Sequence, residues 1–439
     1  RFDPAQTAFA RAAAIDPLNP DYLRRAGECL WQLARHASAI ALWKKNLLQH
    51  PNDAATHAKL GAALSHQGKH LEAFTAYQRA AQESPQDISL ALETARAALT
   101  LQNFDSALPH LERASKLTPN DHTVWQMLGE TYHAKGLNDR ALSALEHAVQ
   151  LAPHLGKPQA EMARVYLHIG KRAEANAAAE AAIELDPNST DVLAAAAEVF
   201  VQTNRHAQGV AASRKVAKGR PDDAESLMNL TRALILEKES APIGNFSKVE
   251  GTERAEIMNQ LERAADLGAD ANAVNVWKAR ALALFGNFKE AIPLLEAAVA
   301  KTPTAEIYCA LASCYRRAGK LTLARKAIES SLEREPTNVS NLIERGRIIL
   351  EQGDVANARE NFERVINLDP QNATAHQLLG ECFQASGKRI EAASVYQKAI
   401  TLDPKQAAWH HRLAELYESR RETSSAIQHY QNATDLAQK

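Results

Sequence analysis

The sequence is poor in the features that usually indicate catalysis, metal binding or membrane insertion. Its 439 residues include four cysteines with no CxxC pair, which indicates neither a disulfide framework nor a zinc site. No apolar run approaches the roughly 18 residues that a membrane span requires. The motifs GxSxG, GxxxxGK[ST], HExxH and GxGxxG are all missing. The sequence therefore predicts a chain that is not an enzyme and has no cofactor, no metal and no membrane span.

Neither sign of charge is in clear excess. Lysine and arginine together number 51, against 52 aspartate and glutamate residues, so no global field points to nucleic acid or to a membrane surface. Aromatic residues make up only 5% of the chain, whereas alanine is abundant. This composition favours closely packed helices over a β core.

Prolines recur at a nearly constant spacing. Seven of them are 34 residues apart, and after a gap four more follow at steps of 33, 34 and 34. They are Pro17, Pro51, Pro85, Pro119, Pro153, Pro187 and Pro221, and then Pro303, Pro336, Pro370 and Pro404. A helix does not run smoothly through proline, and a fixed period of this length indicates one supersecondary unit stacked many times.

Other positions repeat with the same period. A small residue stands ten residues after the proline and a bulky apolar residue stands 26 after it, as in Gly61 and Tyr77. Between them a glycine such as Gly68 predicts the end of a first helix, and Asn, Asp or Ser just after the proline predicts the cap of the next helix. Each period is therefore expected to be a helix–turn–helix pair in which small residues face large ones.

The pattern resembles the tetratricopeptide repeat (TPR) family, whose consensus reads W-x2-L-G-x2-Y, then A-x3-F-x2-A, then P. The clearest match runs from Trp125 through Leu128, Gly129 and Tyr132 to Pro153. The resemblance covers essentially the whole chain. It implies an all-α, right-handed α-solenoid of about twelve units, preceded by a lone second helix near Phe9, with the first helices lining a concave groove.

The missing prolines between Pro221 and Pro303 predict three blocks. Residues 1–221 form an N-terminal TPR block, residues 222–303 hold degenerate units with an insertion loop at 238–252, and residues 304–439 form a C-terminal block of four units. The first helix of the unit after the insertion is expected from Asn275 to Leu284, with its register open by one or two residues.

The candidate binding residues lie on the predicted first helices. One residue beyond the small position, the charge alternates from unit to unit through Arg96, Glu130, Arg164 and Glu198 to Arg232. A ladder of ion pairs between repeats is the favoured interpretation. The alternative is that arginines bind carboxylates of a protein or peptide ligand in the groove. The residues proposed for that groove are Trp31, Arg96, Arg164, Arg232, Arg316, Arg317 and Arg347, with the most basic stretch between 232 and 347.

Histidines and cysteines are interpreted as structural. His133 and His168 lie at nearby positions of successive first helices and are expected to approach each other, whereas His66 and His70 flank Gly68 and are expected on different helices. No third ligand accompanies either pair, so solvated or groove-lining imidazoles are favoured over a metal site. The cysteines are expected to be small buried thiols.

The leading functional hypothesis is a non-catalytic protein–protein interaction scaffold that binds a peptide segment or a partner helix in its groove. The ligand is acidic if the groove arginines bind carboxylates. One alternative is a substrate-recruiting arm of a larger enzyme, such as a glycosyltransferase or protease fusion. Another is a periplasmic scaffold of an envelope or polysaccharide-export machine. A cytoplasmic location is favoured, and the periplasm stays open because the chain starts at Arg1 in mid-pattern. Further repeats, or another chain, are expected to cover the N-terminal helix.

Overall fold

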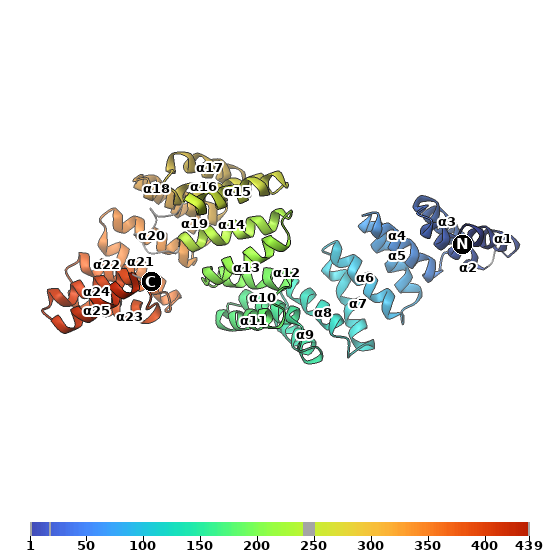
Figure 1. Cartoon of the computed structure of the whole chain (residues 1–439), viewed down its shortest axis with the longest axis horizontal. Helices are drawn as coiled ribbons and strands as arrows, with labels where there is room; N and C mark the ends of the chain where they lie inside the picture. Colours follow the sequence, from blue (N-terminus) through green and yellow to red (C-terminus); the bar gives the residue numbers. More distant parts are fainter. Residues whose placement is uncertain (1, 17–18, 240–250, 438–439) are drawn as a thin grey trace. The chain divides into compact units, whose positions relative to one another are not determined.

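The computed structural model describes residues 2–16, 19–239 and 251–437, which form 25 α-helices and no strand (Figure 1). The helices fall into two compact units, Arg1–Arg205 and His206–Lys439. The first unit contains α1 (Phe2–Ile15), α2 (Pro20–Gln32), α3 (His36–Gln49), α4 (Ala54–His66), α5 (His70–Glu83), α6 (Ile88–Thr100), α7 (Phe104–Leu117), α8 (His122–Ala134), α9 (Asn138–Leu151), α10 (Gly156–His168), α11 (Arg172–Leu185) and α12 (Thr190–Gln202). The second unit contains α13 (His206–Gly219), α14 (Ala224–Glu239), α15 (Gly251–Asp266), α16 (Ala271–Leu284), α17 (Phe288–Lys301), α18 (Ala305–Arg317), α19 (Leu321–Arg334), α20 (Val339–Glu351), α21 (Val355–Leu368), α22 (Ala373–Ala385), α23 (Arg389–Leu402), α24 (Ala407–Ser419) and α25 (Thr423–Ala437).

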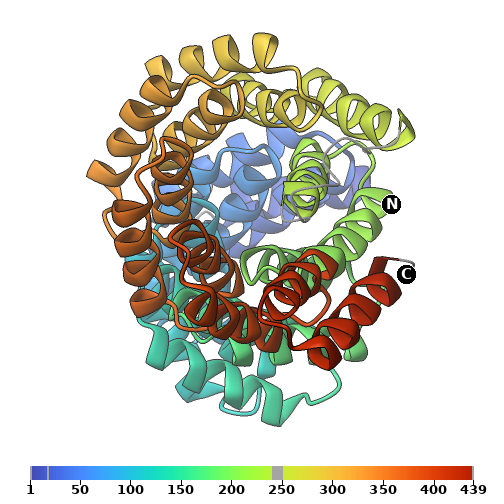
Figure 2. The same ribbon diagram turned by 90° about the vertical axis from the view of Figure 1, so that its left-hand side faces the viewer.

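The helix order confirms the all-α solenoid. One leading helix, α1, is followed by twelve successive helix pairs, as the proline period predicts. Within each unit, even-numbered first helices contact the odd-numbered second helices that follow them, and α10 also contacts the first helices α8 and α12. Figure 2 shows the helices of the second unit, from light green to red, following one another in a curved row. His66 ends α4 and His70 begins α5, which confirms that they lie on different helices.

The predicted capping residues start the first helices. The Asp121 side chain accepts a hydrogen bond from the Thr123 backbone N–H, and the Asn372 side chain accepts one from the Ala375 N–H. Both bonds satisfy N–H groups that have no partner inside the helix. The predicted glycines have positive φ after the first helices, from +73° at Gly68 to +87° at Gly353, and this conformation turns the chain into the second helix.

Small and large residues face each other as predicted. A Cβ atom on Gly27 would lie 2.4 Å from Nε1 of Trp43, which is 2% exposed. Gly346 is equally close to the Phe362 ring, at 2.4 Å from Cε1. These contacts leave no room for a methyl group, so glycine lets the two helices of a pair approach closely.

The region around the insertion differs from the prediction in one boundary. Helix α16 begins at Ala271 rather than Asn275, because the Asp270 side chain accepts a hydrogen bond from the Ala273 N–H and caps the helix earlier. Of the predicted loop 238–252, residues 238 and 239 belong to α14, residues 251 and 252 belong to α15, and residues 240–250 lie outside the described residues.

Candidate functional site

The first-helix surface of the second unit holds four of the predicted binding residues. We use this name for the charged side chains on α14, α16, α18, α20 and α22, which are successive first helices in contact. Among them are five arginines and five glutamates that form ion pairs, ring contacts or electrostatic interactions. They are Arg232, Arg280, Arg316, Arg317 and Arg347, and Glu239, Glu306, Glu344, Glu351 and Glu381.

Arg280 joins three of the helices and was not predicted from the sequence. Its Nε donates to Glu239 on α14 at 3.2 Å, and its Nη1 donates to Glu306 on α18 at 3.0 Å. Its side chain is only 13% exposed and lies over the Trp277 ring at 4.3 Å. Burial lowers the pKa of this guanidinium, but the two glutamates more than offset that effect, so the pKa is raised. Arg280 is therefore fully engaged within the fold.

Arg316 is also engaged. Its Nε donates to Glu344 at 2.7 Å and its Nη1 donates to Glu351 at 2.6 Å, both on α20. Glu344 is itself 7% exposed, so the pair is buried. The two carboxylate partners of Arg316 lie outside the positions at which the charge alternates from repeat to repeat. Part of the predicted basic stretch is therefore neutralised, because glutamates outside the alternating register pair with Arg280 and Arg316.

Arg347 and Arg232 are less well satisfied. Nη1 of Arg347 lies 3.8 Å from Glu344, which already receives Arg316, and its buried Nε has no hydrogen-bond partner among the described residues. Burial lowers the pKa of Arg347, and Arg316 lowers it further against the raising effect of Glu344. The Nε of Arg232 is likewise buried without a partner in the described chain, and its guanidinium lies 5.8 Å from the Trp277 ring. Arg317 lies 5.1 Å from the Phe288 ring, and burial lowers its pKa.

The predicted ladder of ion pairs exists at one step of the first unit. Nε of Arg164 donates to Glu198 in the next repeat at 3.0 Å, and its Nη1 donates to Glu161 on its own helix at 3.1 Å. Arg96 instead pairs with Glu93 on its own helix at 2.8 Å and is 56% exposed. The ladder interpretation is confirmed for Arg164 and does not hold for Arg96.

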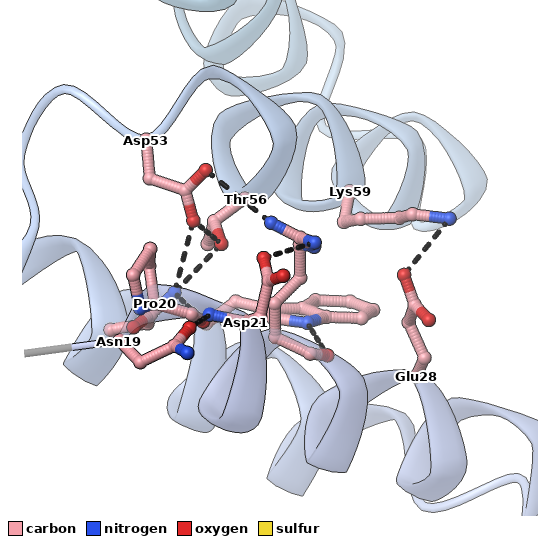
Figure 3. A network of polar contacts seen from close by, with 10 residues as sticks. Asn19, Pro20, Asp21, Glu28, Asp53, Thr56 and Lys59 are labelled. Carbon is pink, nitrogen blue, oxygen red and sulfur yellow. Dashed lines mark hydrogen bonds and ion pairs between the residues drawn. The ribbon is translucent and has the colours of Figure 1, made fainter. Parts of the chain in front are cut away.

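Trp31 lines a cavity at the start of the first unit. The cavity has a volume of about 750 Å³ and lies between α1, α2, α3 and α4. The Trp31 ring stacks on His36 at 4.1 Å and meets the edge of His66 at 5.5 Å. Figure 3 shows Lys59 of α4 reaching Glu28 of α2, at 3.2 Å, beside this cavity. Phe9, Arg25 and Ala62 also line it, and none of them is among the predicted binding residues.

The predicted histidine pair and the cysteines lie where the repeat places them. The rings of His133 and His168 lie 5.4 Å apart, which confirms their predicted approach. No group of three or more potential metal ligands occurs in the described ranges. Cys29, Cys314 and Cys382 are buried and Cys309 is partly buried, and burial raises the pKa of all four thiols. Among the described helices, none has both the length and the apolar character needed to cross a membrane.

Family models match most of the chain. Models described as tetratricopeptide repeat or TPR repeat match residues 64–130, 122–155, 159–189, 259–306, 278–339, 346–387 and 373–406. A model described as bacterial transcriptional activator domain matches residues 2–96. None of the curated proteins matches the chain.

Several solved structures are similar in fold at low sequence identity. The APC/C hetero-tetramer Cut9–Hcn1 matches 100% of this chain and 91% of that chain, with 14% identity and a TM-score of 0.50. YrrB, described as a TPR protein with an unusual peptide-binding site, covers 42% of this chain and 96% of its own, with 20% identity and a TM-score of 0.40. The human IFIT1 dimer with PPP-AAAA covers 80% of this chain and 91% of its own, with 18% identity and a TM-score of 0.47.

The helix pairs, their glycine-mediated packing and the family models agree along the chain. The chain belongs to the tetratricopeptide repeat family.

Proposed function

We propose that the chain is a non-catalytic protein-interaction scaffold whose first-helix surface in the second unit binds an acidic peptide segment of a partner. Membership of the TPR family supports an interaction role. The observation that carries the acidic ligand is the contrast among the arginines. Arg280 and Arg316 each contact two carboxylates, whereas among the described residues neither Arg232 nor Arg347 donates a hydrogen bond to a carboxylate.

A ligand carboxylate would improve the electrostatic environment of Arg347. Its side chain is 27% exposed, so the guanidinium can be reached from solvent. Removing a charged group from water is costly unless an opposite charge accompanies it. Because burial and Arg316 disfavour the charged form of Arg347, an added carboxylate offsets a cost that the fold already carries. Two parallel N–H groups of a guanidinium also match a carboxylate in geometry.

A peptide of defined charge tests this proposal. Fluorescein-labelled (Asp-Glu)₅ is titrated with the chain and compared with (Asn-Gln)₅ by fluorescence anisotropy. We expect the acidic peptide to bind more tightly, and its binding to weaken as salt rises above 0.1 M, where the Debye length is about 10 Å. Equal affinity for the two peptides would overturn the acidic preference.

Charge variants locate the site. Arg232→Gln/Arg347→Gln is expected to weaken binding of the acidic peptide about tenfold, since each lost pair contributes up to about 1 kcal/mol. Lys326→Gln/Lys398→Gln changes the net charge equally, at exposed positions of the second helices α19 and α23, and serves as the matched control. Unchanged binding by the arginine variant, or an equal loss in the control, would reject the assigned surface. Co-purification from the source cells with the same variants then identifies the partner.

A second candidate is an interaction arm of a larger regulatory protein or enzyme. The match of residues 2–96 to the model of a bacterial transcriptional activator domain favours the regulatory form. The complete open reading frame distinguishes this candidate from an independent scaffold, because an interaction arm requires a DNA-binding or catalytic domain beside the repeats. The periplasmic scaffold requires an upstream signal peptide instead.

A further inference from the structure

The cavity of the first unit, here called the N-terminal pocket, has a small residue in its lining where neighbouring repeats have long ones. One residue beyond the small position, neighbouring repeats have long charged side chains such as Glu28 and Arg96, but α4 has Ala62. Ala62 lines the pocket, and its methyl group leaves open the space that a longer side chain would fill. The volume of about 750 Å³ lies within the range of about 300–1,000 Å³ that is common for ligand pockets.

Aromatic rings form the apolar part of the pocket. Trp31 is partly exposed and is held by His36, His66 and Trp43, whose ring centroid lies 6.0 Å away. The Trp43 ring is itself held by a hydrogen bond, because its Nε1 donates to the Arg24 carbonyl at 3.0 Å. These contacts hold the Trp31 ring in place before any ligand arrives, which lowers the entropy cost of binding. A planar apolar side chain would stack on this surface.

The cations of the pocket differ in their partners. Arg24 lies 2.5 Å from Asp21 and 3.6 Å from Asp53, so two carboxylates neutralise it. Asp53 is held in turn by the Thr56 hydroxyl, as Figure 3 shows. Lys59 pairs with Glu28 at 3.2 Å.

Arg25 differs from both. Its guanidinium is exposed and lies 6.0 Å from the Phe9 ring, and among the described residues no carboxylate lies within ion-pair distance of it. The lining therefore has one positive charge that no carboxylate of the described residues compensates.

We propose that the N-terminal pocket binds an aromatic side chain of a partner peptide whose neighbouring residue carries a carboxylate. The aromatic ring lies against Trp31 above Ala62, and the carboxylate pairs with Arg25. The chemistry matches the lining, which is apolar and aromatic at one part and has one uncompensated guanidinium at its edge. This site is separate from the first-helix surface of the second unit and does not depend on the acidic-segment proposal.

Three short peptides test the chemistry. Ac-Ala-Phe-Asp-Ala-NH₂ is compared with the analogues in which Asn replaces Asp or Ala replaces Phe. The readout is the indole N–H resonances of the five tryptophans, 15N-labelled in the full chain. We expect shifts at Trp31 and Trp43, about threefold weaker binding of the Asn peptide and at least tenfold weaker binding of the Ala peptide. Equal binding of all three peptides overturns the proposal, as do shifts confined to Trp125, Trp277 and Trp409.

Variants at exposed positions connect the binding to the pocket. Ala62→Glu fills the space and places a carboxylate near Arg25, so binding should be lost, whereas Ala55→Glu on the same helix, outside the lining, should have no effect. Arg25→Gln should erase the preference for Asp over Asn, and Arg11→Gln is its control. Full binding by Ala62→Glu, or a retained preference in Arg25→Gln, contradicts the assignment. Trp277 reports the second unit, so failure here is distinct from failure of the acidic-segment proposal.

Discussion

At the scale of single residues, packing within a helix pair depends on two side chains sixteen positions apart. Gly61 faces Tyr77, and an added Cβ would lie 2.9 Å from the tyrosine Cγ. In the next repeat the equivalent residues are Ala95 and Leu111, both fully buried. The methyl group of Ala95 fits opposite Leu111, whereas one repeat later Gly129 stands opposite Leu145 and an added Cβ would lie 2.6 Å from the leucine Cγ. The room for a methyl group therefore depends on how each facing side chain packs and not on its type alone.

This complementarity makes Gly61→Ala a destabilising change that a second change can relieve. We expect Gly61→Ala to lower the free energy of unfolding by about 1–3 kcal/mol, because the tyrosine ring cannot move away without disturbing its neighbours. Gly61→Ala/Tyr77→Leu should lose less than the sum of the single variants. Chemical denaturation of the four proteins gives the coupling energy. Strict additivity would show that the two positions do not compete for the same space.

The predicted arginines are expected to contribute unequally to the free energy of unfolding. Arg316 and Glu344 form a buried pair with side chains 14% and 7% exposed, whereas Arg96 and Glu93 are 56% and 38% exposed. We expect Arg316→Gln to cost about 3 kcal/mol of unfolding free energy because it removes the hydrogen-bonded partner of the buried Glu344 and leaves it only Arg347, at 3.8 Å. Arg96→Gln should change stability by under about 1 kcal/mol. Thermal or urea unfolding measures both, and similar effects would contradict the assigned burial.

The sequence predicted the residues whose partners lie at a fixed offset. The glycine contacts and the helix caps repeat every 34 residues, so one period is enough to recognise them. The partners of Arg316 could not be found in this way, since Glu344 and Glu351 are 28 and 35 residues away and depend on side-chain rotamers. The N-terminal pocket was not predicted, because the sequence marks it only by a missing feature. Ala62 lacks the long charged side chain that neighbouring repeats have at this position. Only Trp31 indicated this end of the chain.

At the scale of the helix pair, the turn between the two helices needs one residue with positive φ. Gly68 has φ +73°, and in the next repeat Gln102 takes the same place with φ +54°. A side chain in this conformation costs roughly 1–2 kcal/mol relative to glycine. The sequence showed the turn where glycine marks it and not where glutamine adopts it.

Gln102→Gly is therefore expected to stabilise the chain. We expect a gain of about 0.5–1 kcal/mol, smaller than the strain itself because glycine also gains freedom in the unfolded chain. Gly68→Ala should produce a loss of similar size. Urea midpoints of the two variants check the prediction, and a lower midpoint for Gln102→Gly would show that other contacts of the glutamine dominate.

Ring N–H groups also support the ends of the helix pairs. Nε1 of Trp125 donates to the carbonyl of Pro119 at 2.7 Å, six residues earlier. Nε2 atoms of three histidines lie 2.8–3.3 Å from proline carbonyls at the same offset. These are His57 with Pro51, His376 with Pro370, and His410 with Pro404. Because a carbonyl only accepts, Nε2 of each of these histidines carries a proton. This role of the prolines was not predicted.

The contact between α8 and α10 predicts sensitivity to acid. Burial lowers the pKa of His133, and the neighbouring His168 and Arg164 lower it further. A histidine with a lowered folded-state pKa stabilises the fold above its unfolded value of about 6.5, and this contribution is lost as the pH falls through that value towards the folded pKa. We expect stability to fall between pH 7.5 and 5.5.

The variant His133→Gln isolates this contribution. The unfolding free energy of the variant should fall less steeply than that of the parent over the same pH range. The difference between the two slopes is at most about 1.4 kcal/mol per pH unit, the limit for one proton. His110, His206 and His429 also have a pKa lowered chiefly by burial, so some acid sensitivity remains in the variant. Urea denaturation at five pH values measures the slopes. Identical slopes would show that His133 titrates equally in the folded and unfolded chains.

At the scale of the whole molecule, the proline period predicts the number of helix pairs but not how they group into compact units. The 34-residue repeat predicts twelve units because every repeat buries its own apolar face against the next. The two compact units instead divide between Arg205 and His206, inside a repeat of the period. That boundary depends on how many contacts each helix makes, which periodicity does not record. The blocks 1–221, 222–303 and 304–439 remain a prediction.

A stack of repeats should lose stability locally. Gly346→Ala places a Cβ 2.4 Å from the Phe362 ring and strains the pair α20 and α21. Because each repeat contacts mainly its neighbours, we expect faster amide exchange in α19–α23 and unchanged exchange in α4–α9, measured by hydrogen-exchange mass spectrometry. Lys326→Gln, an exposed change on α19, is the control. A uniform increase over both units would show that the chain opens as one cooperative body, and the nearest-neighbour description would not apply to it.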